Sequence, residues 1–401
     1  MKTGYAWKWG PFEMIDMLGA DWLADRLAAE GRPVPALLEA ARGKTFYREE
    51  GEKAYILTTA GDYAEIPVAD DAWTLADMKR GKQPVKSNAS ASLWDVGDGV
   101  ACLEFHSKMN SLDENSIAMI VQAAKIDKLG FKALIIGSDA DNFSVGANVG
   151  VALFGANAAM WPVIENGVAT GQKAMQGLKN APFPVVAAPA GMALGGGCEV
   201  CLHSDAIQAH AESYMGLVEV GVGLLPGWGG CKELTIRNLA NKRRPQGPMP
   251  ALSAAFEAIS TAKVATSAQE AADMQILREG DGISMNRNRV LADAKQKALA
   301  MADGYVKPEP VEVHLPGPTA ATAFQMAVEG FAQQGKATAY DVEVAAQVGR
   351  ILSGGDTDIT EVVTEKQLLA LELEGFMHLI RQEKTLQRIE HMLTKGRPLR
   401  N

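Results

Sequence analysis

Short apolar strands alternate with helix-like segments between residues 93 and 304, and this alternation limits the fold more than any other feature of the chain. Four runs are typical of strands because each is short, apolar and bounded by Gly, Asp or Pro: GVACLEF, KALIIGS, FPVVAAP and AIQAHAE. From Ser111 the periodicity predicts a helix, opened by a Ser111/Glu114 capping box and closed by Gly130. Strands interleaved with helices predict an α/β domain whose sheet is covered by helices.

The flanking regions have different patterns, so we expect four parts. Residues 1–45 have an apolar helical rhythm but are too few to form a core alone. Residues 46–92 are predicted to be a linker region with short strands, residues 93–304 the α/β core, and residues 305–401 a C-terminal helical region. With 401 residues, 47% of them hydrophobic, the chain has ample material for such a core.

Charge and composition argue against several classes of partner. Lys and Arg number 39 against 48 Asp and Glu, a net charge of −9, so we expect neither nucleic acid nor a membrane surface as partner. The 4 cysteines indicate a reducing compartment rather than a disulfide framework. The most apolar stretch, residues 183–202, is interrupted by prolines, glycines and a glutamate, and the N-terminus lacks a signal-peptide pattern. We therefore expect a cytoplasmic protein.

Two glycine-rich turns after strands are the strongest candidates for ligand binding. The denser one, PAGMALGGGCE, ends at Glu199, and its three consecutive glycines allow close approach of the backbone to a ligand. The other, NFSVGANVG, places Ala147 directly after Gly146. Backbone N–H groups from both turns, aimed at one carbonyl oxygen, would form an oxyanion hole. A tight strand-to-helix turn without a ligand is the alternative interpretation of such a glycine triplet.

Glu199 and Glu219 form a candidate acid–base pair. The strand-like segment DAIQAHAESYMG between them is expected to return the chain to the same cleft, and the glycine-rich GVGLLPGWGG follows Glu219. Two carboxylates in a partly dry cleft can differ in pKa, so that one is protonated while the other is not.

Together these segments resemble the crotonase family of enoyl-CoA hydratases, isomerases and their relatives. PVVAAPAGMALGGGCE and YMGLVEVGVGLLPGWGG are similar to that family's second oxyanion loop and two glutamates in order and spacing. FSVGAN is similar to its first oxyanion loop, and SKMNSLD to its turn near the CoA. The resemblance implies a crotonase-like spiral of ββα units, an acyl-CoA thioester substrate, and neither a metal nor a redox cofactor.

The resemblance also implies roles for single residues. The N–H groups of Ala147 and Gly196 would hold the thioester carbonyl, Glu199 would activate water for attack at C3, and Glu219 would handle the proton at C2. The remaining substrate-binding candidates are Gly146, Gly195, Gly197, Gly223 and Lys108, the last being equally well explained as a solvated loop lysine. The family's usual Asp after the Gly-Ala pair is Asn148 here, which we interpret as a local change in hydrogen bonding.

With both glutamates present, the expected enzyme is an enoyl-CoA hydratase, a lyase that converts 2-enoyl-CoA to 3-hydroxyacyl-CoA in fatty-acid β-oxidation. An isomerase, hydrolase or decarboxylase of the same fold is an alternative. Another is a non-catalytic crotonase-like subunit that docks a dehydrogenase or thiolase partner. The acyl chain length is left open.

The two ends of the chain carry a second resemblance. GYAWKWGPFEMIDMLG resembles the C-terminal helical domain of 3-hydroxyacyl-CoA dehydrogenases, and RIEHMLTKGRPLRN resembles the end of bifunctional fatty-acid-oxidation proteins. A G-x-G-x-x-G motif is missing from the sequence, so no dehydrogenase activity is expected from this chain alone. The amphipathic segments after Thr319 are expected to form homo-oligomer contacts or to cover the chain's own site.

Other chemistry-bearing residues are expected to be structural. Cys198 and Cys201 form a lone C-x-x-C pair where a helix should begin, and a zinc site needs further ligands. His203 and His210 are interpreted as ordinary structural histidines. The stretch Val151–Leu178 is expected to wall the acyl pocket or to be a core helix.

Overall fold

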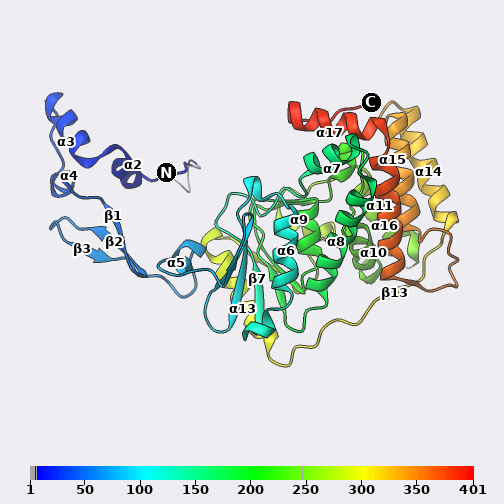
Figure 1. Cartoon of the computed structure of the whole chain (residues 1–401), viewed down its shortest axis with the longest axis horizontal. Helices are drawn as coiled ribbons and strands as arrows, with labels where there is room; N and C mark the ends of the chain where they lie inside the picture. Colours follow the sequence, from blue (N-terminus) through cyan, green and yellow to red (C-terminus); the bar gives the residue numbers. More distant parts are fainter. Residues whose placement is uncertain (1–4, 6, 246) are drawn as a thin grey trace. The chain divides into compact units, whose positions relative to one another are not determined.

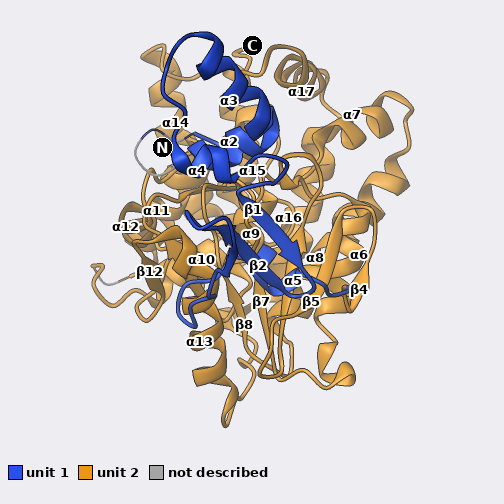
Figure 2. Cartoon of the chain, turned by 90° about the vertical axis from the view of Figure 1, so that its left-hand side faces the viewer, with its two compact units in different colours: residues 1–83 blue, residues 84–401 orange. Residues whose placement is uncertain are grey.

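The computed structural model describes residue 5, residues 7–245 and residues 247–401. The chain separates into two compact units, Met1–Gln83 and Pro84–Asn401 (Figure 2). Met1 and two residues of the aromatic Gly-Pro motif, Gly4 and Ala6, lie outside the described residues. The finer division into four parts stays a prediction.

The first unit combines helices with a small antiparallel sheet. Its helices are α2 (Pro11–Leu18), α3 (Ala20–Ala29), α4 (Ala36–Ala40) and α5 (Leu75–Lys79), and its sheet has the order β1 (Tyr47–Glu50), β2 (Lys53–Leu57), β3 (Tyr63–Glu65). The expected helical rhythm is confirmed, but Gly19, at φ 94°, divides it into two helices. Helices and strands share one small core of Ala20, Ala24, Leu38, Ala41, Phe46 and Leu57. The first 45 residues therefore bury their apolar stripe partly against residues of the following strands.

A seven-stranded sheet forms the centre of the second unit. Its order is β12 (Gly282–Ser284), β10 (Ala206–His210), β8 (Val185–Ala187), β7 (Ala133–Ile136), β6 (Val100–Phe105), β5 (Ala91–Asp95), β4 (Lys86–Ser87). From β6 to β12 neighbouring strands are parallel, with Cys102 opposite Ile135 and Ile135 opposite Val186, whereas β4, β5 and β6 are antiparallel. The four expected strands are thus confirmed as β6, β7, β8 and β10.

Shorter strand pairings form a second layer outside the main sheet. β9 (Met192–Leu194) pairs in parallel with β11 (Tyr214–Gly216), while single bridges join Ser144 to Ala193 and Leu112 to Ala147. The chain therefore runs repeatedly from a main strand through a short second-layer strand to a helix. This arrangement confirms the expected α/β spiral of ββα units.

Helices cover the main sheet and continue into a C-terminal helical region. α13 packs on one face against β6, β7, β8 and β10, and α6 lies on the other against β5 and β6 (Figure 1). α15 packs between α14 and α16, which confirms helices after Thr319. The bounds are α6 Glu114–Ala123, α7 Val149–Asn157, α8 Trp161–Lys179, α9 Gly196–Leu202, α10 Gly230–Ala240, α11 Pro248–Ser260, α12 Ala268–Asp273, α13 Val290–Ala302, α14 Pro318–Gln333, α15 Ala339–Leu352, α16 Glu365–Ile380 and α17 Glu383–Lys395, with β13 Glu312–Val313 and β14 Val363–Thr364. Among the described residues, no helix combines the length and apolar character needed to cross a membrane.

The capping box predicted at Ser111 and Glu114 is wrong. Leu112 donates its N–H to Gly146 and accepts from Asn148, so the chain is still extended there. The helix begins two residues later than predicted, capped by Asp113, whose side chain accepts from the N–H of Ser116 at 2.8 Å. It also ends early, at Ala123, and Gly130 instead closes the short 3₁₀ turn η2 (Ile126–Leu129).

Candidate active site

The two glycine-rich turns lie side by side because the first loop pairs with β9. Ser144 donates its N–H to the carbonyl of Met192 at 3.0 Å and accepts from Leu194 at 2.9 Å. Since β9 leads directly into Gly195, this pairing sets Gly146 and Ala147 beside Gly196. A Cβ atom on Gly146 would lie 3.2 Å from the Gly196 nitrogen, and one on Gly196 would lie 3.4 Å from the Ala147 nitrogen. The structure thus brings together the two predicted oxyanion donors.

The N–H groups of Ala147 and Gly196 have no hydrogen-bond acceptor within the described part of the chain. Gly196 is the first residue of α9, where an N–H has no partner inside the helix. In the first loop, the N–H of Leu112 donates to the carbonyl of Gly146, and the N–H of Asn148 donates to the carbonyl of Leu112. The N–H of Ala147, which lies between them in the chain, therefore points away from Leu112. Two neighbouring free donors of this kind can polarise one carbonyl oxygen.

Glu199 lies in the first turn of α9 and is almost completely buried, at 2% exposure. Its Oε1 accepts the backbone N–H groups of Trp228 and Gly230, each at 2.8 Å. Burial raises the pKa of Glu199, while the two N–H donors and the nearby Lys232 ammonium oppose that shift. Glu199 is therefore held in place by a turn that favours its charged form.

Glu219 opens the 3₁₀ turn η3 (Glu219–Val222), just after β11. The Gly195 N–H donates to the carbonyl of Gly216 at 2.9 Å, and a Cβ atom on Gly195 would lie 3.0 Å from Glu219 Oε1. The other oxygen, Oε2, is buried without a hydrogen-bond partner among the described residues. Burial raises the pKa of Glu219, and the charge of Glu199 raises it further. The pair is asymmetric, with Glu199 better prepared to be a carboxylate and Glu219 to hold a proton.

The indole of Trp228 lies against the oxyanion turn. A Cβ atom on Gly196 would be 2.6 Å from Trp228 Cζ3, and one on Gly171 of α8 would be 2.5 Å from Trp228 Cδ1. The ring therefore fits between α8 and α9 only because both positions are glycine. Its six-membered edge forms a wall next to the two free N–H groups.

The other predicted substrate-binding residues lie in different surroundings. Gly197 packs against the first loop, since a Cβ atom there would be 2.7 Å from the carbonyl oxygen of Ser144. Gly223 ends η3 at φ 78°, and its carbonyl accepts from Thr385 of α17 at 2.7 Å. Lys108 is exposed on the 3₁₀ turn η1 (Lys108–Asn110). Their roles in substrate binding stay predictions.

Of the residues expected to be structural, Cys198, Cys201 and His203 are buried in or next to α9, whereas His210 ends β10 and is half-buried. Cys198 and Cys201 are free, fully buried thiols whose pKa values are raised by burial. His203 donates from Nδ1 to the carbonyl of Glu199 at 2.7 Å, and burial lowers its pKa to about 3. Asn148 caps α7 by accepting the N–H of Gly150 at 3.1 Å.

The sequence analysis missed the groups that hold Glu199. The run GWGG was noted only as a glycine-rich turn, although its backbone supplies both donors to Glu199. Glu372 on α16 binds the same turn and was not predicted from the sequence. The one local signal for Glu372 is a carboxylate placed inside the apolar run LLALELEGF.

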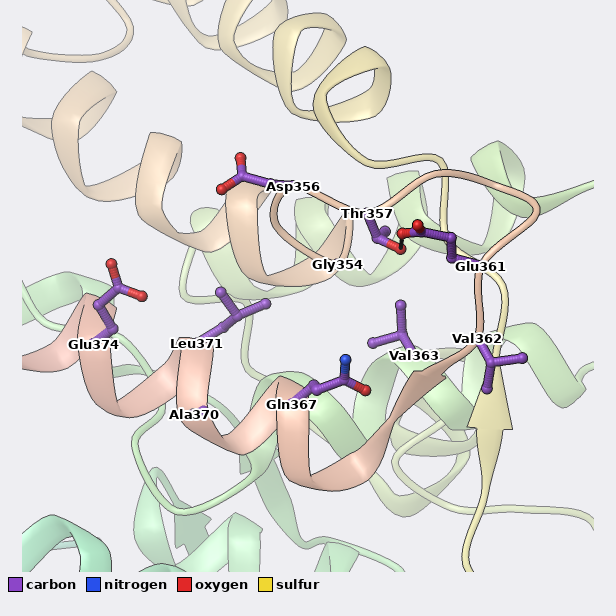
Figure 3. A pocket seen from close by; sticks show the side chains of 10 residues that line it. All are labelled: Gly354, Asp356, Thr357, Glu361, Val362, Val363, Gln367, Ala370, Leu371 and Glu374. Carbon is purple, nitrogen blue, oxygen red and sulfur yellow. Dashed lines mark hydrogen bonds between the residues drawn. The ribbon is translucent and has the colours of Figure 1, made fainter.

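A pocket of about 580 Å³ lies elsewhere in the second unit, near the start of α16 (Figure 3). Three carboxylates line it, from Asp356, Glu361 and Glu374, together with apolar side chains such as Leu371. It contains none of the predicted site residues. Its acidic lining would repel an anionic ligand such as a phosphate.

Comparison with known proteins finds one family model and several curated relatives that match this chain. Residues 95–248 match the family model described as Enoyl-CoA hydratase/isomerase. The chain is 39% identical over 405 residues to a "Probable 3-hydroxyacyl-CoA dehydrogenase" of Bacillus subtilis, covering 100% of this chain and 51% of that protein. It is 27% identical over 391 residues to a "Putative fatty acid oxidation complex trifunctional enzyme" of Rickettsia felis, covering 97% and 48% respectively. The chain thus spans about half the length of these curated relatives.

Solved structures share the fold. An enoyl-CoA hydratase/isomerase from Mycobacterium paratuberculosis superposes with a TM-score of 0.51 at 17% identity, over 76% of this chain and 99% of that one. An enoyl-CoA hydratase from Bacillus halodurans gives a TM-score of 0.52 at 16% identity, over 75% and 99%. At this level of identity the likeness establishes the fold alone.

Proposed function

The chain carries a domain of the enoyl-CoA hydratase/isomerase (crotonase) family at residues 95–248, and from this premise we propose that it hydrates 2-enoyl-CoA to 3-hydroxyacyl-CoA. The observation that carries the proposal is the pair of free N–H groups, on Ala147 and Gly196, next to the buried Glu199 and the half-buried Glu219. Hydration needs both features: donors for the charge that develops on the thioester oxygen, and one base with one acid.

In the proposed reaction, the N–H groups of Ala147 and Gly196 bind the thioester oxygen. Glu199, as carboxylate, takes a proton from a water whose oxygen forms a bond to C3. The C2=C3 electron pair moves towards the thioester as an enolate, and protonated Glu219 gives its proton to C2. Afterwards Glu199 holds a proton and Glu219 has lost one, and exchange with solvent restores the starting state. The pKa asymmetry of the pair supports this assignment of base and acid.

The relatives suggest a wider context for this reaction. Both curated relatives are about twice the length that this chain covers, and their names refer to a dehydrogenase and to a trifunctional oxidation enzyme. We propose that the chain acts together with a 3-hydroxyacyl-CoA dehydrogenase, which would oxidise the product of hydration. Assembly into a homo-oligomer stays a prediction.

The test is loss of the absorbance of the conjugated enoyl thioester with crotonyl-CoA. The wild type is expected to be active, and Glu199→Gln and Glu219→Gln each to lower kcat about 10²–10⁴-fold, the usual contribution of a general acid or base. Glu104→Gln is the matched control, because Glu104 is a buried carboxylate that accepts from the Trp94 indole and does not contact the pair.

Other outcomes would redirect the proposal. Binding of crotonyl-CoA without loss of absorbance would favour a different crotonase reaction, such as isomerisation or thioester hydrolysis. Neither turnover nor binding would favour a non-catalytic subunit. Equal losses in Glu104→Gln and the two site variants would contradict the assigned roles.

A further inference from the structure

One turn binds two buried carboxylates at the start of α10. The N–H groups of Trp228 and Gly230 donate to Glu199 Oε1, each at 2.8 Å. The backbone N–H of Gly229 donates to Glu372 Oε2, and the backbone N–H of Lys232 donates to Glu372 Oε1, each at 2.7 Å. Neighbouring donors of the turn therefore alternate between Glu199 and Glu372.

Glu372 comes from a distant part of the chain. It lies on α16, beyond the family-matched residues 95–248, and its side chain is fully buried at 0% exposure. Both of its oxygens are engaged by backbone N–H groups at the start of a helix, where free donors and the helix dipole favour a carboxylate. A deeply buried carboxylate that makes two short bonds to one turn fixes the conformation of that turn.

The charged neighbours of Glu372 are already paired with one another. The Lys232 ammonium binds Glu233 at 2.5 Å and Glu365 at 2.9 Å, and Lys179 of α8 binds the same two carboxylates at 2.6 and 2.9 Å. His203 also faces this cluster, 3.7 Å from Glu233. Two lysines thus balance two glutamates, with neither lysine in an ion pair with Glu372. Burial, together with the charge of Glu199, raises the pKa of Glu372 well above its usual value, although its two N–H donors and Lys232 oppose that shift.

We propose that Glu372 is a positioning residue, which holds Gly229 and Lys232 so that the N–H groups of Trp228 and Gly230 stay aimed at Glu199. It does not touch the reacting atoms. Its effect passes through the backbone of the turn to the carboxylate that we assign as the base. Only the kinetic part of the test below rests on the proposed function.

Two variants separate this role from a simple charge effect. Glu372→Gln keeps the size but sets an amide NH₂ against one of the two N–H groups. Glu372→Asp keeps the charge but withdraws the carboxylate by one methylene. If the turn loses its anchor, Glu199 loses N–H donors that stabilise its charged form, so its pKa rises in both variants. Removal of a like charge alone would instead lower the pKa of Glu199 in Glu372→Gln and leave it unchanged in Glu372→Asp.

The experiment is a carbon-13 NMR titration of the full chain labelled at the glutamate carboxyl carbons, with Glu199→Gln used to assign the Glu199 signal. The Glu199 midpoint is expected to move up by roughly one pH unit in Glu372→Gln and Glu372→Asp. Asp205→Asn is the control: Asp205 accepts from the Val185 N–H and the Tyr305 hydroxyl, each at 2.8 Å, and does not bind the turn. An unchanged or lowered midpoint in whichever variant folds would overturn the proposal.

A kinetic measurement adds a second readout. Glu372→Gln is expected to lower kcat for crotonyl-CoA about 10-fold or more with little change in KM, because a displaced base slows the chemical step more than binding. The acid limb of its pH profile should move to higher pH with the NMR midpoint. If the wild type does not hydrate crotonyl-CoA, the proposed function fails, while the titration still decides the role of Glu372.

Discussion

Two glycines on α8, one turn apart, make a matched test of the wall formed by Trp228. A Cβ atom on Gly167 would meet nothing within 4 Å, whereas one on Gly171 would lie 2.5 Å from Trp228 Cδ1 and Cε2 and closer still to Trp228 Nε1. The same substitution, Gly to Ala, should therefore have opposite effects at the two positions. Gly167→Ala should stabilise the protein by about 0.5–1 kcal/mol, because alanine loses less backbone entropy than glycine in a helix.

The size of the effect at Gly171 follows from the contact distance. Non-bonded atoms pack at about 3.5–4.0 Å, so the Trp228 ring must retreat by at least about 1 Å to admit the new methyl group. Overpacking of this kind costs about 1–3 kcal/mol. Since both variants gain the same helix propensity, Gly171→Ala should be less stable than Gly167→Ala by about that amount. Urea unfolding of the two variants side by side measures the difference.

The activity of Gly171→Ala should fall as well. The displaced ring also packs against Gly196, and a misplacement of about 1 Å near reacting groups can cost on the order of 10²-fold in rate. Turnover of crotonyl-CoA measures this loss, with Gly167→Ala expected to match the wild type. Equal stability of the two variants would refute the packing argument. A loss of stability without loss of turnover would show that Trp228 is not part of the active site.

Two further predictions concern Glu219 and the start of α6. Glu219→Gln should be more stable than the wild type in alkaline buffer but not in acidic buffer. A carboxyl with a raised folded-state pKa keeps its proton at low pH, and its stability contribution is lost as pH rises through that pKa. An equal difference in Tm between Glu219→Gln and the wild type at both pH values would count against this prediction. Asp113→Ala should cost about 1 kcal/mol in urea unfolding through loss of the helix cap, and Ser111→Ala less than about 0.5 kcal/mol. The reverse order would favour the capping box at Ser111.

The sequence was informative where structure depends on neighbouring residues. The strands β6, β7, β8 and β10 and the C-terminal helices follow from local apolar patterns, and the structure confirms them. The start of α6 could not be predicted in the same way. Leu112 remains extended because it pairs with the loop around Ala147, a contact that local periodicity does not encode.

In the candidate site, too, local patterns were predicted from the sequence and contacts between distant residues were not. Its loops and glutamates were identified from the sequence, and the structure places Ala147 beside Gly196 and Gly195 beside Glu219. The functional roles of these residues stay predictions. Glu372 could not be found, because it lies in an otherwise ordinary amphipathic helix and binds a turn 140 and 143 positions earlier in the chain.

That separation has a consequence for the order of events during synthesis. At about 5–20 residues per second, a ribosome needs on the order of 7–30 s to extend the chain from Gly229 to Glu372, which are 143 positions apart. Throughout this interval the nascent chain already contains both glutamates and both glycine-rich loops, but the N–H groups of Gly229 and Lys232 must bind water instead. The turn that holds Glu199 can therefore reach its final conformation only after α16 has emerged and docked, so α16 completes a site whose other parts were synthesised earlier.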